Sequence, residues 1–168
     1  GVAGTLMSNL GMELSLKELG IPFYRANVGD RYVIEAMRER KWQLGGESSG
    51  HIICSDLTTT GDGVVAALQV LHAMRDTDTP LNALKKGMQK YPQKMINVRI
   101  KQKFNLEDFP AIQQAVGAAE SELAERGRVL LRPSGTEPLV RVMVEGEDNQ
   151  QVDILVKQIA AVVEKEIG

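Results

Sequence analysis

A polar stretch between two strand-like runs stands out near the C-terminal end of the chain. Residues 129–131 are apolar and predict one strand, and residues 139–145 alternate with the period of two that is typical of another. In the second run the valines at 140, 142 and 144 share one face, whereas Arg141, Met143 and Glu145 share the other. The two runs therefore predict a β-hairpin, joined by the sequence Arg132-Pro133-Ser134-Gly135-Thr136-Glu137-Pro138.

The hairpin belongs to a predicted α+β domain over residues 95–168. A strand is expected from Met95 to Lys101, and a helix from about Asp108 to Arg126. The helical-period stripe of this helix contains Phe109, Ile112, Val116, Ala119 and Leu123, and that of the C-terminal helix contains Val152, Leu155, Val156, Ile159, Val163 and Ile167. The order β-α-β-β-α predicts a small antiparallel sheet backed by two helices.

Strands and helices alternate in the first half of the chain. Strands are expected at residues 2–7, 23–28 and 42–44, the last breaking at 45–51 and resuming at 52–54. Helices are expected at residues 8–20, with capping by Ser8 or Asn9, at 30–40, with capping by Asp30, and after 58–63, with Val64, Ala67, Leu68, Leu71 and Met74 on one side. This alternation predicts a three-layer α/β domain with mainly parallel strands over residues 1–78, followed by a linker with a short helix over residues 79–94.

Composition and charge exclude several classes of function. The 168 residues are 43% hydrophobic and 25% charged, which is ordinary for a soluble globular protein. A net charge of -2 and a pI near 5.8 give no electrostatic case for nucleic acid or acidic membranes, and we interpret the basic residues of 85–103 as a solvated face. No apolar stretch has the length of a bilayer span. The single Cys54 lies in an apolar run, which indicates a buried thiol and a reducing, cytoplasmic setting.

The stretch that joins the two hairpin strands suits a phosphate. Arg132 offers a planar fork of donors, Ser134 and Thr136 add hydroxyl donors, and Gly135 lets backbone N–H groups approach an anion. The stretch is also longer than the two to five residues that a simple reversal needs. The alternative is a turn in which Ser134 and Thr136 hydrogen-bond only their own backbone.

A second informative stretch is Gly45-Gly46-Glu47-Ser48-Ser49-Gly50-His51. Glu47 and Ser49 offer an acceptor and a donor for adjacent sugar hydroxyls, and His51 can move a proton near neutral pH. The alternative is a glycine-rich bulge in which His51 caps a neighbour. His72 is interpreted as packing on a helix surface or at the edge of the core, and Asp62 as a helix cap. Since no Walker motif or zinc spacing is present, the two polar stretches together suggest a phosphorylated sugar held between two domains.

Both polar stretches resemble motifs of one family. Residues 132–138 are similar to the phosphate-binding loop in the last domain of the α-D-phosphohexomutases, and residues 46–51 are similar to the Gly-Glu-x-Ser-Gly-His sugar loop of their third domain. Four further segments resemble the bacterial branch of that family that acts on glucosamine phosphate: residues 4–11, 28–33, 58–63 and 139–146. The resemblance covers essentially the whole chain.

The resemblance implies a phosphoryl transfer between the 1- and 6-positions of a hexosamine phosphate, on the route to UDP-N-acetylglucosamine and the cell wall. The family works through a phosphoserine, a bound Mg²⁺ and a bisphosphate intermediate. Carried over by motif, the phosphate would be bound by Arg132, Ser134, Gly135 and Thr136. Arg141, on the polar face of its predicted strand, is a further candidate for the phosphate, and the alternative is an ion pair at the surface. The sugar hydroxyls would be read by Glu47 and Ser49, Gly29-Asp30 would help to select the sugar, and His51 is the candidate proton shuttle.

The chain departs from the family in lacking two motifs. It contains neither the Ser-His-Asn-Pro catalytic loop nor the Asp-x-Asp-Gly-Asp metal loop, so we expect the Mg²⁺ ligands outside this chain and no metal ligands within it. The chain is therefore expected to be a C-terminal portion, inactive alone, whose partners are a hexosamine phosphate, the N-terminal domains of the same protein and, in a homodimer, a second copy. Two alternatives stay open: a non-catalytic phosphosugar-binding module, and a mutase for mannose or glucose phosphate.

Overall fold

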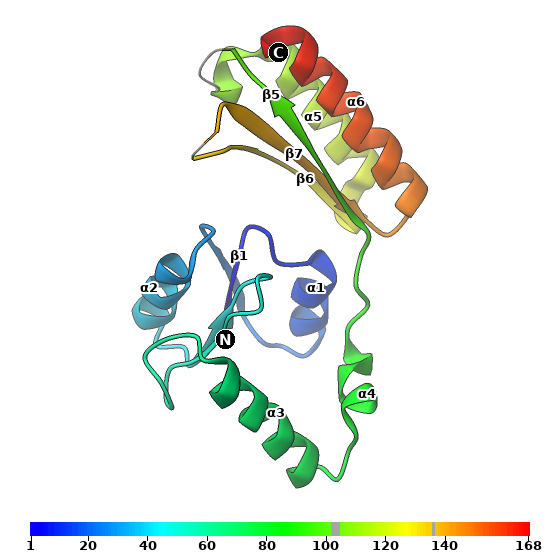
Figure 1. The fold of residues 1–168 in the computed structure, drawn as a ribbon. Coiled ribbons are helices and arrows are strands. Elements are labelled where there is room, and N and C mark those ends of the chain that lie inside the picture. Colours follow the sequence, from blue (N-terminus) through cyan, green and yellow to red (C-terminus); the bar gives the residue numbers. More distant parts are fainter. Residues whose placement is uncertain (102–104, 136) are drawn as a thin grey trace. The chain divides into compact units, whose positions relative to one another are not determined.

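The computed structural model describes residues 1–101, 105–135 and 137–168. The chain divides into two compact units, unit 1 (Gly1–Lys90) and unit 2 (Tyr91–Gly168), which are coloured blue to green and green to red in Figure 1. The predicted linker, residues 79–94, spans this division. Each unit has its own sheet and its own core, so each is described by itself.

Unit 1 is a mixed α/β layer built on a four-stranded sheet. Its strands are β1 (Val2–Thr5), β2 (Phe23–Ala26), β3 (Leu44–Gly46) and β4 (Ile52–Cys54), in the order β2-β1-β3-β4. Its helices are α1 (Leu10–Glu18), α2 (Asp30–Arg40), α3 (Gly63–Asp76) and α4 (Leu81–Leu84), followed by the 3₁₀ helix η1 (Lys85–Gly87). β1 runs parallel to β2 and β3, which confirms the predicted α/β class.

The prediction that the third strand resumes after residue 51 was wrong. β3 and β4 are antiparallel neighbours, with Gly46 opposite Ile52 and Leu44 opposite Cys54. The chain turns back because Glu47 N–H donates to the His51 carbonyl at 3.0 Å and Gly50 N–H donates to the Glu47 carbonyl at 3.1 Å. The polar stretch is therefore the connection of a hairpin, and both of its ends are held by the sheet.

Helix α2 covers one face of this sheet. The core between them contains Ala3, Ala26, Val33, Ala36, Met37 and Ile53, all less than 6% exposed. Gly45 lets the helix approach closely, since a Cβ at this position would lie 2.5 Å from Met37 Sδ and 2.8 Å from Val33 Cγ1. Cys54 is buried, as predicted.

Helix α3 begins as predicted but exposes its apolar side. Asp62 caps it, accepting from the N–H groups of Val64 and Val65 at 2.8 and 3.0 Å. Val64, Leu68 and Leu71 of the predicted stripe are 70%, 56% and 57% exposed. The helix rests on its neighbours β4 and α4 through other positions, of which Ala66 is buried. His72 lies on the surface of α3, with Nδ1 2.8 Å from Asp76 Oδ2.

Unit 2 is an antiparallel sheet with two helices on one face (Figure 1). Its strands are β5 (Gln93–Arg99), β6 (Gly127–Pro133) and β7 (Leu139–Gly146), in the order β5-β7-β6. Its helices are α5 (Pro110–Leu123) and α6 (Asn149–Ile167), with 3₁₀ turns η2 (Leu106–Asp108) and η3 (Ala124–Arg126). This arrangement confirms the predicted α+β architecture.

The core of unit 2 lies between the sheet and the two helices. The predicted valines 140, 142 and 144 are fully buried there, and all six apolar residues predicted for the last helix are at most 3% exposed. Two residues on the opposite face of β7 are also buried, because Met143 is 1% exposed and Glu145 is 0% exposed. Glu145 is neutralised by Arg128, whose Nε lies 2.7 Å from Glu145 Oε2.

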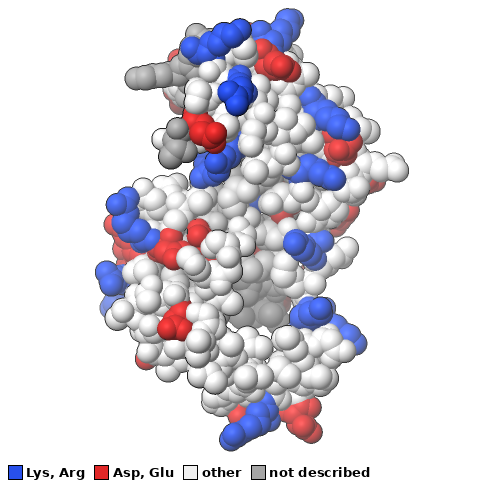
Figure 2. Space-filling model, viewed as in Figure 1, with Lys and Arg blue, Asp and Glu red and all other residues white. Residues whose placement is uncertain are grey.

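Charged side chains are distributed over both units. On the face seen in Figure 2, basic and acidic groups are interspersed over the surface. Within the described residues, none of the helices has both the length and the hydrophobicity to cross a membrane.

Candidate functional site

Two arginines face each other across the hairpin of unit 2. Arg132 of β6 is the register partner of Arg141 of β7, and both lie on the face opposite the core valines. The Nε atoms of both side chains are buried, and neither has a hydrogen-bond partner among the described residues. Burial lowers the pKa of Arg132 from its ordinary value, and the charge of Arg141 lowers it further.

This pairing is unfavourable unless an anion is added. Like charges directly opposite each other on a sheet are destabilising, and unpaired buried donors carry a desolvation cost. Arginine forks match the oxygens of a phosphate, which would supply both the missing acceptors and the missing negative charge. The pair therefore has the properties of an anion site.

The cross-strand row extends to a third residue that sequence reasoning did not single out. Asn97 of β5 is the register partner of Arg141 on its other side, and it is exposed. Its carboxamide places a further donor and acceptor on the same face as the two arginines. The sequence signal was present, since Asn97 stands between Ile96 and Val98 at a polar position of the alternation in a predicted strand.

The connection between β6 and β7 is shorter than expected. β6 continues to Pro133 and β7 begins at Leu139, so the strands are joined by the five residues 134–138, and Arg132 lies in a strand. This length is within the range of an ordinary hairpin, so the argument from loop length was wrong. Ser134 Oγ accepts from Glu137 N–H at 3.3 Å, which is the local hydrogen bond expected if the stretch is an ordinary turn. The two arginines with buried Nε atoms, rather than the turn, favour phosphate. Gly135 is exposed, and Thr136 lies outside the described residues.

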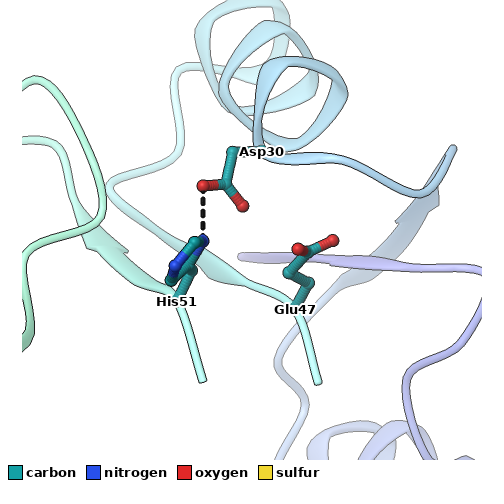
Figure 3. A group of neighbouring side chains, drawn as sticks. All are labelled: Asp30, Glu47 and His51. Carbon is teal, nitrogen blue, oxygen red and sulfur yellow. Dashed lines mark hydrogen bonds and ion pairs between the residues drawn. The ribbon is translucent and has the colours of Figure 1, made fainter. Parts of the chain in front are cut away.

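The predicted sugar-reading residues of unit 1 converge in space. Figure 3 shows Asp30 from the start of α2 pointing toward Glu47 and His51 from the β3–β4 connection. Glu47 is held by both oxygens: Gly29 N–H donates to Oε2 at 3.1 Å, and Ser49 Oγ donates to Oε1 at 2.9 Å. The carboxylate is thus fixed in orientation and retains lone pairs for other donors.

Gly29 makes the link between α2 and this loop. Its φ of 127° is a conformation that side-chain-bearing residues rarely adopt, and it brings the Gly29 N–H onto Glu47. Gly29 is also the N-cap of α2, without a side-chain cap, so the prediction that Asp30 caps this helix was wrong. Asp30 is instead the first helical residue, and its Oδ2 lies 2.7 Å from His51 Nδ1.

One group of described residues has the spacing of a metal site. Ligand atoms of Asp30, Glu47 and His51 all lie within 4.8 Å of one another. The group fits Mg²⁺ poorly, because this ion takes oxygen ligands in octahedral geometry, and here one ligand is a nitrogen already in contact with an Asp30 oxygen. We therefore derive no step through Mg²⁺ from these residues.

The two units match two domains of one family. Residues 1–91 match the phosphoglucomutase/phosphomannomutase alpha/beta/alpha domain III, and residues 95–162 match the phosphoglucomutase/phosphomannomutase C-terminal domain. The chain belongs to the phosphoglucomutase/phosphomannomutase family, and the predicted family resemblance is confirmed.

Within this family the chain is similar to phosphoglucosamine mutases. It is 62% identical to that of Cellvibrio japonicus and 58% identical to that of Hahella chejuensis, in each case over 164 residues. These matches cover 98% of this chain but 37% of each relative, so the chain spans little more than a third of their length. A solved structure of Aspergillus fumigatus N-acetylphosphoglucosamine mutase, in complex with GlcNAc-6P and magnesium, has the same fold, with a TM-score of 0.78, 21% identity and coverage of 97% of this chain and 41% of that one.

Proposed function

We propose that this chain is the C-terminal portion of a phosphoglucosamine mutase, which interconverts glucosamine 6-phosphate and glucosamine 1-phosphate. The observation that carries the proposal is the pair of opposed, partly buried arginines Arg132 and Arg141. Such a pair is costly in a fold that has no anion to bind. The high identity to phosphoglucosamine mutases supports glucosamine as the sugar.

In this proposal unit 2 holds the phosphate that does not react. Arg132 and Arg141 neutralise it, and Ser134, Gly135 and Thr136 contribute the hydroxyl and backbone donors that the family motif provides. Binding the non-reacting phosphate supplies energy that orients the sugar for the transfer at its other end. The cationic pair thus acts in binding and positioning, without forming a covalent bond.

Unit 1 reads the sugar in this proposal. Glu47, fixed by Gly29 N–H and Ser49, accepts from sugar hydroxyls, and Ser49 adds a hydroxyl. The Gly29-Asp30 turn lies next to this carboxylate, where it restricts the shape of the sugar that fits. His51 is the candidate proton carrier for the sugar oxygen that gains or loses the phosphoryl group.

The remaining chemistry is proposed to lie outside this chain. The phosphoserine and the Mg²⁺ ligands would be in the additional length that the relatives have, so the 168 residues alone are expected to have no mutase turnover. The other domains of the same protein are then the first partners of the chain. A cytoplasmic setting is part of the proposal and agrees with the single, buried Cys54; homodimerisation stays a prediction.

The proposal is tested by titrating isotope-labelled chain with glucosamine 6-phosphate, with glucosamine and inorganic phosphate as comparisons. Backbone amide shifts at Ser134 and Gly135 are expected with the two phosphate-bearing ligands, and shifts at Glu47 and Ser49 with the sugar phosphate. Arg141→Gln should abolish the shifts in unit 2. The control Arg126→Gln, at an exposed position just before β6, should leave them unchanged.

A second arm uses the longer protein and measures mutase turnover. Turnover lost in Arg132→Gln and kept in Arg126→Gln supports the enzyme, and preferred turnover of mannose or glucose phosphate would reassign the sugar. Binding of glucosamine 6-phosphate without turnover in the longer protein would favour the non-catalytic module. Absence of phosphate-dependent shifts in the longer protein would reject the site.

A further inference from the structure

The side chain of Asp30 is the partner of one specific ring nitrogen of His51. Asp30 Oδ2 lies 2.7 Å from His51 Nδ1, a contact drawn as the dashed line in Figure 3. The Asp30 carboxylate is 31% exposed, and the imidazole ring is 58% exposed. The contact joins residues that are 21 positions apart in the sequence, so it is a product of the fold.

An ionised carboxylate only accepts hydrogen bonds, so the nitrogen that faces it must carry the proton. A neutral imidazole has one N–H and one acceptor nitrogen, and the bond made by the first decides which nitrogen is the second. We propose that Asp30 is a positioning residue that holds the proton of neutral His51 on Nδ1 and so presents Nε2 as the proton acceptor of the site.

The backbone fixes both partners of the contact. Asp30 is the first residue of α2. Tyr32 N–H donates to the Gly29 carbonyl at 3.0 Å, and Val33 is fully buried, so this end of the helix is held in place. His51 is fastened at the other side, because its carbonyl accepts from Glu47 N–H at 3.0 Å. The contact therefore joins two anchored backbones, which restricts the orientation of the ring.

The second carboxylate of the cluster accepts from donors other than His51. Glu47 Oε2 accepts from Gly29 N–H at 3.1 Å, and Glu47 Oε1 accepts from Ser49 Oγ at 2.9 Å. The two carboxylates thus have separate roles. Asp30 orients the histidine, and Glu47 accepts hydrogen bonds from Gly29 and Ser49. This positioning role is additional to the proposed part of the Gly29-Asp30 turn in selecting the sugar.

The role of Nε2 as a proton acceptor rests on the proposed function, whereas the Nδ1-protonated tautomer of His51 does not depend on it. A mutase in which His51 carries its proton on Nε2 would overturn this inference alone. A chain that binds no phosphosugar would overturn the proposed function and leave the tautomer unchanged. The tautomer is therefore measured without any ligand.

The tautomer is read from long-range ¹H–¹⁵N spectra of chain labelled with ¹⁵N-histidine, at about pH 8.5, roughly two units above the reference imidazole pKa of about 6.5. The chain contains only two histidines, so each ring gives one resolvable spin system. The wild-type ring of His51 should show a protonated Nδ1 and a pyridine-type Nε2. In Asp30→Ala the pyridine-type resonance should move to Nδ1, whereas Asp30→Asn, whose amide oxygen can still accept, should keep the wild-type pattern.

A matched control is available in the same spectra. His72 Nδ1 lies 2.8 Å from Asp76 Oδ2, so Asp76→Ala should alter the His72 signals and leave those of His51 unchanged. If Asp30→Ala does not fold, Asp30→Ser replaces it, because the serine side chain is too short to reach His51 Nδ1. A proton on Nε2 of wild-type His51, or a pattern that is unaffected by losing the Asp30 carboxylate, overturns the proposal.

In the longer enzyme the same variants separate positioning from structural support. Asp30→Ala should lower kcat at least tenfold with little change in KM, and Asp30→Asn should restore most of that loss. Equal losses in both variants, or a change confined to KM, would contradict a positioning role.

Discussion

Arg132 and Arg141 face each other across two adjacent antiparallel strands, each with a buried Nε that lacks a partner among the described residues. Such a pair is unfavourable by itself, since like charges opposite each other on a sheet are destabilising. The pair is understandable when an anion completes it.

Replacing one arginine should make unit 2 more stable and less able to bind phosphate. We expect Arg141→Gln to raise the free energy of unfolding by about 0.2–1 kcal/mol, the usual range for a cross-strand pair. Its affinity for a phosphate ester should fall at least tenfold. Denaturant unfolding and ligand titration of the same two proteins measure both effects, and a variant that loses stability and keeps affinity would contradict the anion site.

The same reasoning predicts that inorganic phosphate stabilises the wild-type chain. A ligand that binds only the folded state at about 100 times its Kd adds roughly 2.7 kcal/mol. This gain should appear as a higher unfolding midpoint of unit 2 in the wild type and be absent in Arg132→Gln. Chloride at the same ionic strength is the control, and an equal gain with chloride would indicate a general salt effect.

The buried pair of Glu145 and Arg128 should be important for the stability of unit 2. Glu145 is 0% exposed, and its ion pair with Arg128 has an N–O distance of 2.7 Å. Glu145→Ala leaves a partly buried guanidinium without that carboxylate, so we expect a loss of up to about 3 kcal/mol in the free energy of unfolding. Thermal and denaturant unfolding measure the loss, and the exposed Glu166→Ala is the control. A loss below 1 kcal/mol would mean that water reaches the pair easily.

Two glycines should respond in opposite directions to the same added methyl group. A Cβ at Gly45 would lie 2.5 Å from Met37 Sδ and 3.0 Å from the Ala3 carbonyl oxygen, so Gly45→Ala should destabilise unit 1 by about 1–3 kcal/mol. Gly117 lies within α5 with nothing within 4 Å of the position of a Cβ, so Gly117→Ala should stabilise unit 2 by up to about 1 kcal/mol. Hydrogen exchange resolves the two units, and a neutral Gly45→Ala would show that α2 can shift away.

The pH dependence of the stability of unit 2 should reflect the ion pair between Asp153 and Lys157 of α6. The hydrogen bond from Lys157, 2.6 Å away, is the largest cause of the lowered pKa of Asp153, and the charges of Lys157 and Lys94 add to it. Because the folded-state pKa is depressed, the contribution to stability is present above the ordinary value of 3.8 and is lost as pH falls through the folded-state pKa. The pair is exposed, so the effect is small. Asp153→Asn should be less stable than wild type near pH 6 and equal to it near pH 2; a difference that persists near pH 2 would need another cause.

The periodic elements were predictable because their signal is local. The apolar stripe of α6 and the alternation of β7 each follow from residues within one element, and both faces were assigned correctly to the core of unit 2. The same rule placed apolar residues on one side of α3 but did not reveal that this side is exposed. Exposure depends on what packs against a helix, which is information outside the helix itself.

The candidate site was predictable in its residue types and less so in its contacts. Strand alternation placed Arg141 on the face away from the core, but Arg132 was assigned to a loop, because the sequence does not show that β6 extends to Pro133. The partnership of Asp30 with His51 depends on the reversal of the chain between β3 and β4, which no local pattern indicates. Register and chain direction are properties of paired strands, and a single strand does not encode them.

The placement of Arg132 and Arg141 within paired strands separates two features that could change independently during evolution. The hydrogen-bonded ladder sets the spacing of the two guanidinium groups, whereas residues 134–138 lie outside the ladder. Insertions or substitutions in that connection can therefore alter the shape of the ligand that is accepted without moving the charges that attract it. A shift of β6 by one residue, in contrast, would turn Arg132 toward the valine core and remove the charge pair in a single step.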